Sequence, residues 1–212
     1  MKALLFDFDG VVIRSMEDHY EGWRRALEEY GIEMIPEELY VLEGQGVVEV
    51  AHQLTRKYNL PFDQAPQIIE KKCLYYDQIK KIEFYPYVTE TLAWAKQKNL
   101  KMAVVTGGDR YRVEKALEDF GLLDYFDAIV TAEDVRQTKP SPEPYLLAAS
   151  LLECQPADCI VIENAPLGIR SAKAAGMECV AVTTTLAPSF LKQADVVVRR
   201  FEQLLPVLKK LY

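Results

Sequence analysis

The sequence predicts an α/β fold, a doubly wound and Rossmann-like parallel sheet with one inserted α-helical domain. Three observations favour it. Short apolar runs rich in valine and isoleucine recur along the chain, helix-period stretches separate most of them, and one long segment near the N-terminus has helical periodicity only. The 212 residues, of which 50% are hydrophobic, suffice for such a core without disulfides.

Five apolar runs are the expected strands, because continuous apolar strands belong in a parallel sheet covered on both faces. They are residues 3–6, 102–105, 128–130, 160–162 and 180–182. A polar residue follows each run, and ligands of open parallel sheets bind outside the carboxyl ends of the strands. We therefore expect these polar residues to converge on one rim of the sheet.

Helices are expected between the strands at residues 113–120, 144–152 and 169–175, with Gly121 and Gly176 as stops. Residues 15–83 contain only helical patterns, far more than the dozen or so residues that a crossover needs. We interpret them as a cap domain that covers the rim, while residues 1–14 and 84–212 form the core domain. The junctions near residues 13–15 and 82–86 would act as hinges.

Composition limits the partners. The 25 Lys and Arg against 32 Asp and Glu give a net charge of -7, which offers no broad basic surface for nucleic acid. The 4 cysteines form no CxxC pair and are expected to be buried in a reducing cytoplasm. No apolar run approaches the ~20 residues of a membrane span. We expect a soluble cytoplasmic protein, as a monomer or weak homodimer, without membrane contact.

Two carboxylates follow the first strand. Asp7 and Asp9 are two residues apart, so both side chains point to the same side if the chain stays extended, and Gly10 then lets the backbone turn. The alternative is an ordinary Asp-Gly turn.

Three further signals follow other strands. Thr106 and Gly107 could donate hydrogen bonds to a phosphoryl group, although they could also form a plain turn. Lys139 precedes a helix start at Ser141 and Pro142, where it would attract a phosphate oxygen unless it is merely solvated. Glu163 and Asn164 offer oxygen ligands for Mg²⁺, although Asn164 could instead cap a helix before Pro166.

In this order the signals resemble the haloacid dehalogenase superfamily, specifically its helical-cap members of the phosphoglycolate phosphatase-like and β-phosphoglucomutase-like types. The matching residues are Asp7-Phe8-Asp9-Gly10-Val11 for motif one, Thr106 for motif two, Lys139-Pro140 for motif three, and Glu163-Asn164 with Gly168, Ala172, Ala175, Gly176 and Met177 for motif four. The resemblance covers essentially the whole chain.

The resemblance implies that Asp7 attacks phosphorus, while protonated Asp9 gives a proton to the leaving oxygen and later activates water. It implies Mg²⁺ on Asp7, on the backbone carbonyl of Asp9 and on the Glu163-Asn164 pair. A carboxylate and a phosphate repel by about 4 kcal/mol per charge pair at ~4 Å and an effective dielectric of about 20, so Mg²⁺ and Lys139 are required. Relatives usually have Glu-Asp at the pair, so Asn164 predicts weaker Mg²⁺ binding.

In the predicted cap, His19 and Trp23 resemble the HxxAW motif, with Gly22 in place of alanine. His19 would position Asp9 or simply contact solvent, and Trp23 is expected in the cap core. Gln45 and Glu43 are candidate specificity contacts. Arg14 is another candidate or, as we prefer, an exposed hinge residue. The loop at residues 42–47 lacks the arginine that β-phosphoglucomutase-like members use for the distal phosphate.

The sequence thus predicts a Mg²⁺-dependent phosphatase of a small phosphorylated metabolite, of the sugar phosphate or phosphoglycolate type, with an aspartyl-phosphate intermediate. The alternative is a β-phosphoglucomutase-like sugar phosphomutase. A noncatalytic binding protein would not need both Asp7 and Asp9, and the dehalogenase branch does not need Asp9.

Overall fold

The protein is built on a six-stranded parallel sheet, as seen in a computed structural model that describes residues 2–212. The strands are β1 (Ala3–Phe6), β2 (Lys101–Val105), β3 (Ala128–Val130), β4 (Cys159–Glu163), β5 (Glu178–Val182) and β6 (Val196–Val198). Their order is β3-β2-β1-β4-β5-β6, so the chain order reverses at β1. The predicted doubly wound α/β fold is confirmed.

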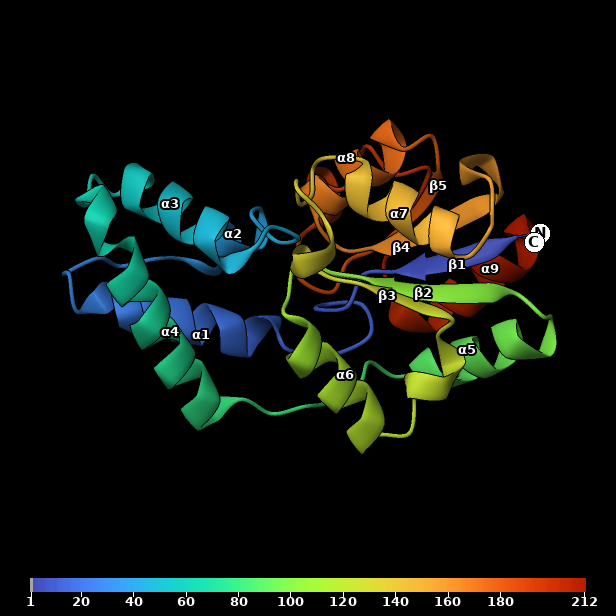
Figure 1. Ribbon diagram of the computed structural model, residues 1–212, viewed down its shortest axis with the longest axis horizontal. Coiled ribbons are helices and arrows are strands. Elements are labelled where there is room, and N and C mark those ends of the chain that lie inside the picture. The colour runs from blue at the N-terminus through green and yellow to red at the C-terminus, as the bar shows by residue number, and fades with distance from the viewer. Residues whose placement is uncertain (1) are drawn as a thin grey trace.

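Helices cover both faces of the sheet (Figure 1). One face packs against α5 (Val88–Gln97), α6 (Arg110–Asp119) and α9 (Leu204–Leu211), and the other against α7 (Glu143–Leu151) and α8 (Pro166–Ala174). Because side chains alternate along a strand, Leu4 and Phe6 of β1 enter the first layer while Ala3 and Leu5 enter the second. Every β1 residue is therefore buried.

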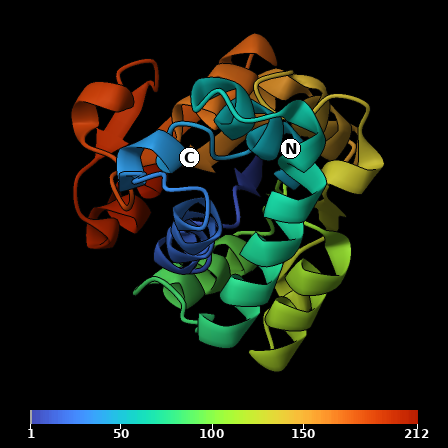
Figure 2. The same cartoon turned by 90° about the vertical axis from the view of Figure 1, so that its left-hand side faces the viewer.

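Of the α-helices between β1 and β2, α5 covers the sheet, and four precede it: α1 (Met16–Glu28), α2 (Pro36–Tyr40), α3 (Val47–Lys57) and α4 (Ala65–Ile79). We call them the helical insertion. It stands beyond one end of the sheet, opposite the chain termini, and α1 packs along α4 (Figures 1 and 2). Trp23 of α1 is buried, as expected. The exact cap boundaries at residues 15 and 83 stay a prediction.

Three local predictions need correction. The pattern does not predict β6, because this strand has three residues and only Val198 is buried. Helix α7 begins at Glu143 with Pro142 as its N-cap, so the predicted start at Ser141 lies one residue too early, and Ser141 Oγ accepts a hydrogen bond from the Glu143 N–H at 3.2 Å. Cys73 is exposed, although the other three cysteines are buried.

No helix within residues 2–212 has the length and apolar character needed to cross a membrane. The predicted glycine stops are confirmed, since Gly121 and Gly176 follow α6 and α8 with φ of 65° and 75°.

Gly168 of α8 generates a stability prediction. A Cβ there would lie 1.6 Å from Oε1 of Glu163, a carboxylate that two side chains and two backbone N–H groups hold in place. Glycine to alanine in a helix normally stabilises by about 1 kcal/mol. Because the carboxylate must move, we expect Gly168→Ala to destabilise the protein by about 2 kcal/mol or more, measured by urea unfolding.

Gly22→Ala in α1 is the matched control, because its nearest neighbour would be the Lys72 carbonyl oxygen at 3.1 Å. We expect a much smaller change there. A Gly168→Ala protein as stable as the native one would show that Glu163 is not fixed by this packing.

Candidate active site

A pocket of about 480 Å³ lies where the carboxyl ends of the strands meet the helical insertion. Asp7, Asp9 and Thr106 line it from the sheet side, and His19 and Gln45 line it from the insertion. It lies beside β1, where the strand order reverses and ligands of doubly wound sheets bind. Its volume suits a small metabolite.

Asp7 immediately follows β1 and is 2% exposed. Its Oδ1 accepts a hydrogen bond from Lys139 Nζ at 2.6 Å, while its Oδ2 has no partner within residues 2–212. Burial raises the pKa of Asp7, Lys139 opposes the rise, and Glu163 adds to it. The ionised form of Asp7 therefore depends on nearby positive charge.

Lys139 is buried, so its interpretation as a solvated lysine is wrong. Its Nζ donates to Asp7 Oδ1 at 2.6 Å, to Glu163 Oε1 at 2.7 Å and to the Val105 carbonyl oxygen at 2.9 Å. Burial alone would lower the pKa of Lys139, but the carboxylates of Asp7 and Glu163 raise it. The ammonium group thus joins the ends of β1, β2 and β4.

Both carboxylate oxygens of Glu163 already accept two hydrogen bonds each. Its Oε1 accepts hydrogen bonds from Lys139 and from the Tyr145 hydroxyl at 2.9 Å, and its Oε2 accepts from the N–H groups of Asn164 at 2.9 Å and Ala165 at 3.2 Å. Glu163 therefore positions Lys139 in this arrangement.

Asn164 does not cap α8, since the N-cap residue is Ala165 and no side chain caps this helix. Its Nδ2 donates to Glu43 Oε2 at 2.8 Å and to Thr185 Oγ1 at 3.1 Å. Its Oδ1 is buried and has no partner within the described residues. The capping alternative is wrong, and the amide oxygen is available to a ligand.

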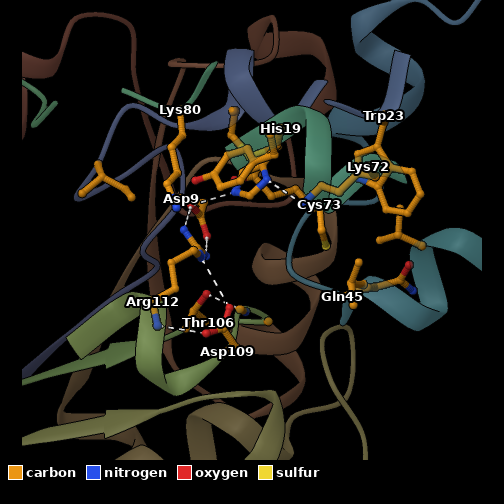
Figure 3. A pocket seen from close by; sticks show the side chains of 18 of the residues that line it. Asp9, His19, Trp23, Gln45, Lys72, Cys73, Lys80, Thr106, Asp109 and Arg112 are labelled. Atoms are coloured by element: carbon orange, nitrogen blue, oxygen red, sulfur yellow. Dashed lines mark hydrogen bonds and ion pairs between the residues drawn. The ribbon is translucent and has the colours of Figure 1, made fainter. Parts of the chain in front are cut away.

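Asp9 forms a bidentate ion pair with Arg112, whose two terminal nitrogens donate to its oxygens at 2.8 and 2.6 Å (Figure 3). The Ser15 hydroxyl also donates to Asp9, and His19 Nε2 lies 3.4 Å from Oδ1. Burial alone would raise the pKa of Asp9, but Arg112 and His19 hold it well below its ordinary value. Asp9 is therefore ionised in this arrangement.

His19 is not a solvent-exposed residue of the insertion. Its ring stacks on Tyr76 with 4.3 Å between centroids, and its Nδ1 lies 3.1 Å from Lys72 Nζ. Burial and the charge of Lys72 lower the pKa of His19 to about 4, so the ring is neutral at pH 7. Burial also lowers the pKa of Lys72 to about 8.

The loop between α2 and α3 lies directly on the sheet residues. A Cβ on Gly107 would meet the Gln45 carbonyl oxygen at 2.5 Å, and one on Gly44, where φ is +93°, would meet Lys139 Cδ at 2.8 Å. Only glycine permits so close an approach at both positions. Thr106 Oγ1 is nearby on the pocket wall and accepts from the Gly108 N–H at 3.0 Å.

The remaining candidate residues differ in whether they line the pocket. Arg14 is exposed, pairs with Glu17 at 3.0 Å and does not line the pocket, in agreement with the preferred hinge interpretation. Trp23 packs in the core and also lines the pocket. Arg112 and Lys72 were not found from the sequence. The only signal for Arg112 is its place in the first turn of the helix that follows Thr106.

The residues fit a magnesium ion. Buried polar atoms without a partner are costly, and carboxylate and amide oxygens are ligands that Mg²⁺ prefers. Beside Asp7, such atoms are Asn164 Oδ1 and Glu43 Oε1, as judged within residues 2–212. No group of three or more His, Cys, Asp or Glu side chains in this part of the chain could hold a metal by itself, so the amide or a backbone carbonyl would have to contribute.

Arg112→Gln tests the ion pair. Without the guanidinium, the pKa of Asp9 should rise, so its carboxylate should take up a proton at higher pH than in the native protein. Carboxyl-carbon NMR of aspartate-labelled protein, titrated downward from pH 7, measures this. In the native protein the Asp9 signal should stay that of the ionised form well below its ordinary pKa.

Arg110→Gln is the control, because Arg110 lies on the same helix but pairs with Glu114 and Asp134. It should leave the Asp9 titration unchanged. An Asp9 titration that is the same in the native and Arg112→Gln proteins would contradict the ionised state assigned here.

Comparisons with known proteins agree with this geometry. A family model described as haloacid dehalogenase-like hydrolase matches residues 4–182. The chain is 32% identical over 181 residues to the fructose-1-phosphate phosphatase YqaB of Escherichia coli, covering 85% of this chain and 95% of the relative. It is 31% identical over 218 residues to a phosphorylated carbohydrates phosphatase of Thermotoga maritima, covering 99% of each chain.

Among solved structures, the β-phosphoglucomutase of Clostridium difficile superposes with a TM-score of 0.85 at 28% identity, covering 99% of this chain and 96% of that one. The family model spans most of the chain and both strand ends that carry Asp7 and Glu163. This protein belongs to the haloacid dehalogenase-like hydrolases.

Proposed function

We propose that the protein is a Mg²⁺-dependent phosphatase of small phosphorylated metabolites, of the sugar phosphate or phosphoglycolate type. The observation that carries the proposal is the environment of Asp7, which has one oxygen on Lys139 and the other unpartnered within residues 2–212. The relatives named as phosphatases of fructose 1-phosphate and phosphorylated carbohydrates support it.

In the first step the free carboxylate oxygen of Asp7 attacks phosphorus, which forms an aspartyl-phosphate and releases the alcohol. Lys139 holds the other oxygen of Asp7 and offsets part of the negative charge. A bound Mg²⁺ would screen the repulsion between carboxylate and phosphate. Thr106 and Gly107 line the same wall and would position the phosphoryl group.

Asp9 would act as the acid and base. Ionised by Arg112, it is ready to take a proton from the water that attacks the aspartyl-phosphate. To protonate the leaving oxygen, Asp9 must first take up a proton from solvent, so the contact with Arg112 must loosen in that step. His19, neutral and beside Asp9, is placed to orient it.

The residues that line the pocket all come from one chain, and we place the reaction in a monomer or weak homodimer. The four free cysteines are compatible with a reducing cytoplasm, where we place the reaction.

A sugar phosphomutase is the second candidate, because a structural neighbour is a β-phosphoglucomutase. The loop over the site, residues 42–47, contains no arginine for a second phosphate. Arg112 and Lys72 also line the pocket, but they face Asp9 and His19. These contacts favour the phosphatase.

The first test measures inorganic phosphate released from sugar phosphates, phosphoglycolate, nucleotides and an aryl phosphate, with Mg²⁺ or with EDTA. We expect release with Mg²⁺ only. Asp7→Asn should lower it by on the order of 10³-fold or more, because the amide is a poor nucleophile. Asp77→Asn is the control, since Asp77 is exposed at the pocket rim and pairs with Lys80.

Conversion of a hexose 1-phosphate with bisphosphate present, without phosphate release, would select the mutase. Failure of every substrate and of acetyl phosphate to phosphorylate the protein would contradict both enzymes.

A second prediction concerns Asn164. Its amide oxygen brings no charge, so Asn164→Asp should bind Mg²⁺ more tightly than the native protein. Isothermal titration with MgCl₂ measures the change. Equal or weaker binding by the variant would contradict this prediction.

A further inference from the structure

Glu43 is a buried carboxylate that belongs to the helical insertion, on the loop between α2 and α3. Acidic side chains are almost never fully buried unless they are paired. Glu43 Oε2 accepts a hydrogen bond from Asn164 Nδ2 at 2.8 Å, and Oε1 has no partner within residues 2–212. Among those residues no lysine, arginine or histidine forms an ion pair with Glu43.

Glu43 also lies against the turn that carries the predicted nucleophile. A Cβ placed on Gly10 would be 3.1 Å from Glu43 Oε1 and 2.1 Å from Asn164 Nδ2. The unpartnered oxygen of Glu43 is therefore beside the backbone between Asp7 and the helical insertion.

The local charges do not balance. Asp9 is neutralised by Arg112, and Lys139 pairs with both Asp7 and Glu163, whereas within residues 2–212 no cation pairs with Glu43. If Asp7, Glu163 and Glu43 were all ionised, they and one ammonium would leave two negative charges in excess, and burial accordingly raises the pKa of Glu43 well above its ordinary value. A buried excess of this kind is costly, and a single divalent cation would balance it.

We propose that Glu43 completes the magnesium site with a carboxylate supplied by the insertion, an inference that rests on the proposed function. Oε2 holds the Asn164 amide so that its Oδ1 is left for the cation, and Oε1 is a further oxygen for it. Glu43 thereby restores the negative charge that residue 164 lacks as asparagine. The charge comes from the insertion instead of from the sheet.

This arrangement links the cation to the position of the insertion. Asp7 and Asn164 follow strands of the sheet, while Glu43 lies on the loop between α2 and α3. Because coupling between two equilibria is reciprocal, Mg²⁺ favours the closed insertion and closure tightens Mg²⁺ binding.

Isothermal titration with MgCl₂ in the absence of substrate tests the proposal. Glu43→Gln keeps the shape and removes the charge, so we expect Mg²⁺ affinity to fall by about tenfold or more. Glu43→Asp keeps the charge and should lose less. Glu49→Gln, an exposed carboxylate in the first turn of α3, is the control and should bind as the native protein does.

The double variant Glu43→Gln with Asn164→Asp moves the charge from the insertion to the sheet. It should recover most of the lost affinity, and circular dichroism confirms that each variant is folded. Native affinity in Glu43→Gln would overturn the proposal and leave the phosphatase standing. If Glu43→Gln lowered the Mg²⁺ affinity and the double variant did not recover it, the proposal would also be overturned. If the native protein bound no Mg²⁺ at all, the proposed cofactor itself would be refuted.

Discussion

Lys139 bridges the carboxylates of Asp7 and Glu163, and the geometry of the site depends on this buried contact. The two carboxylates follow or end neighbouring strands β1 and β4, and the ammonium group also binds the last carbonyl of β2. Without it, two acidic groups would repel one another in a place where water cannot screen them. Removing one partner of a buried ion pair lowers stability strongly, because the other charge is left buried and unpaired. Lys139 therefore holds Asp7 and Glu163 at fixed distances.

The same rim holds a second, separate pair. Arg112 neutralises Asp9, whereas Asp7 keeps one oxygen free, so two aspartates two residues apart have pKa values shifted in opposite directions. Environments that divide neighbouring carboxylates in this way assign them different roles. This difference is in line with the proposed roles of Asp7 as the nucleophile and Asp9 as the group that transfers protons.

Topology explains what the sequence could predict. Asp7, Thr106, Glu163 and Asn164 follow or end apolar strands, so their convergence follows from a parallel sheet alone. Arg112, Lys72 and the burial of Glu43 could not be predicted, because they depend on how a helix or loop packs against that rim. The short edge strand β6 could not be predicted either, since three residues are too few to show a hydrophobic periodicity.

Asp7 is proposed to carry the phosphoryl group, and borohydride trapping detects this intermediate. The protein is quenched during turnover of its best substrate, or of acetyl phosphate, and is then reduced, which converts an aspartyl-phosphate to homoserine. Peptide mass spectrometry should find homoserine at residue 7 only when phosphate donor and Mg²⁺ are both present. Turnover without modification at Asp7, or with modification at another residue, would contradict phosphoryl transfer through Asp7.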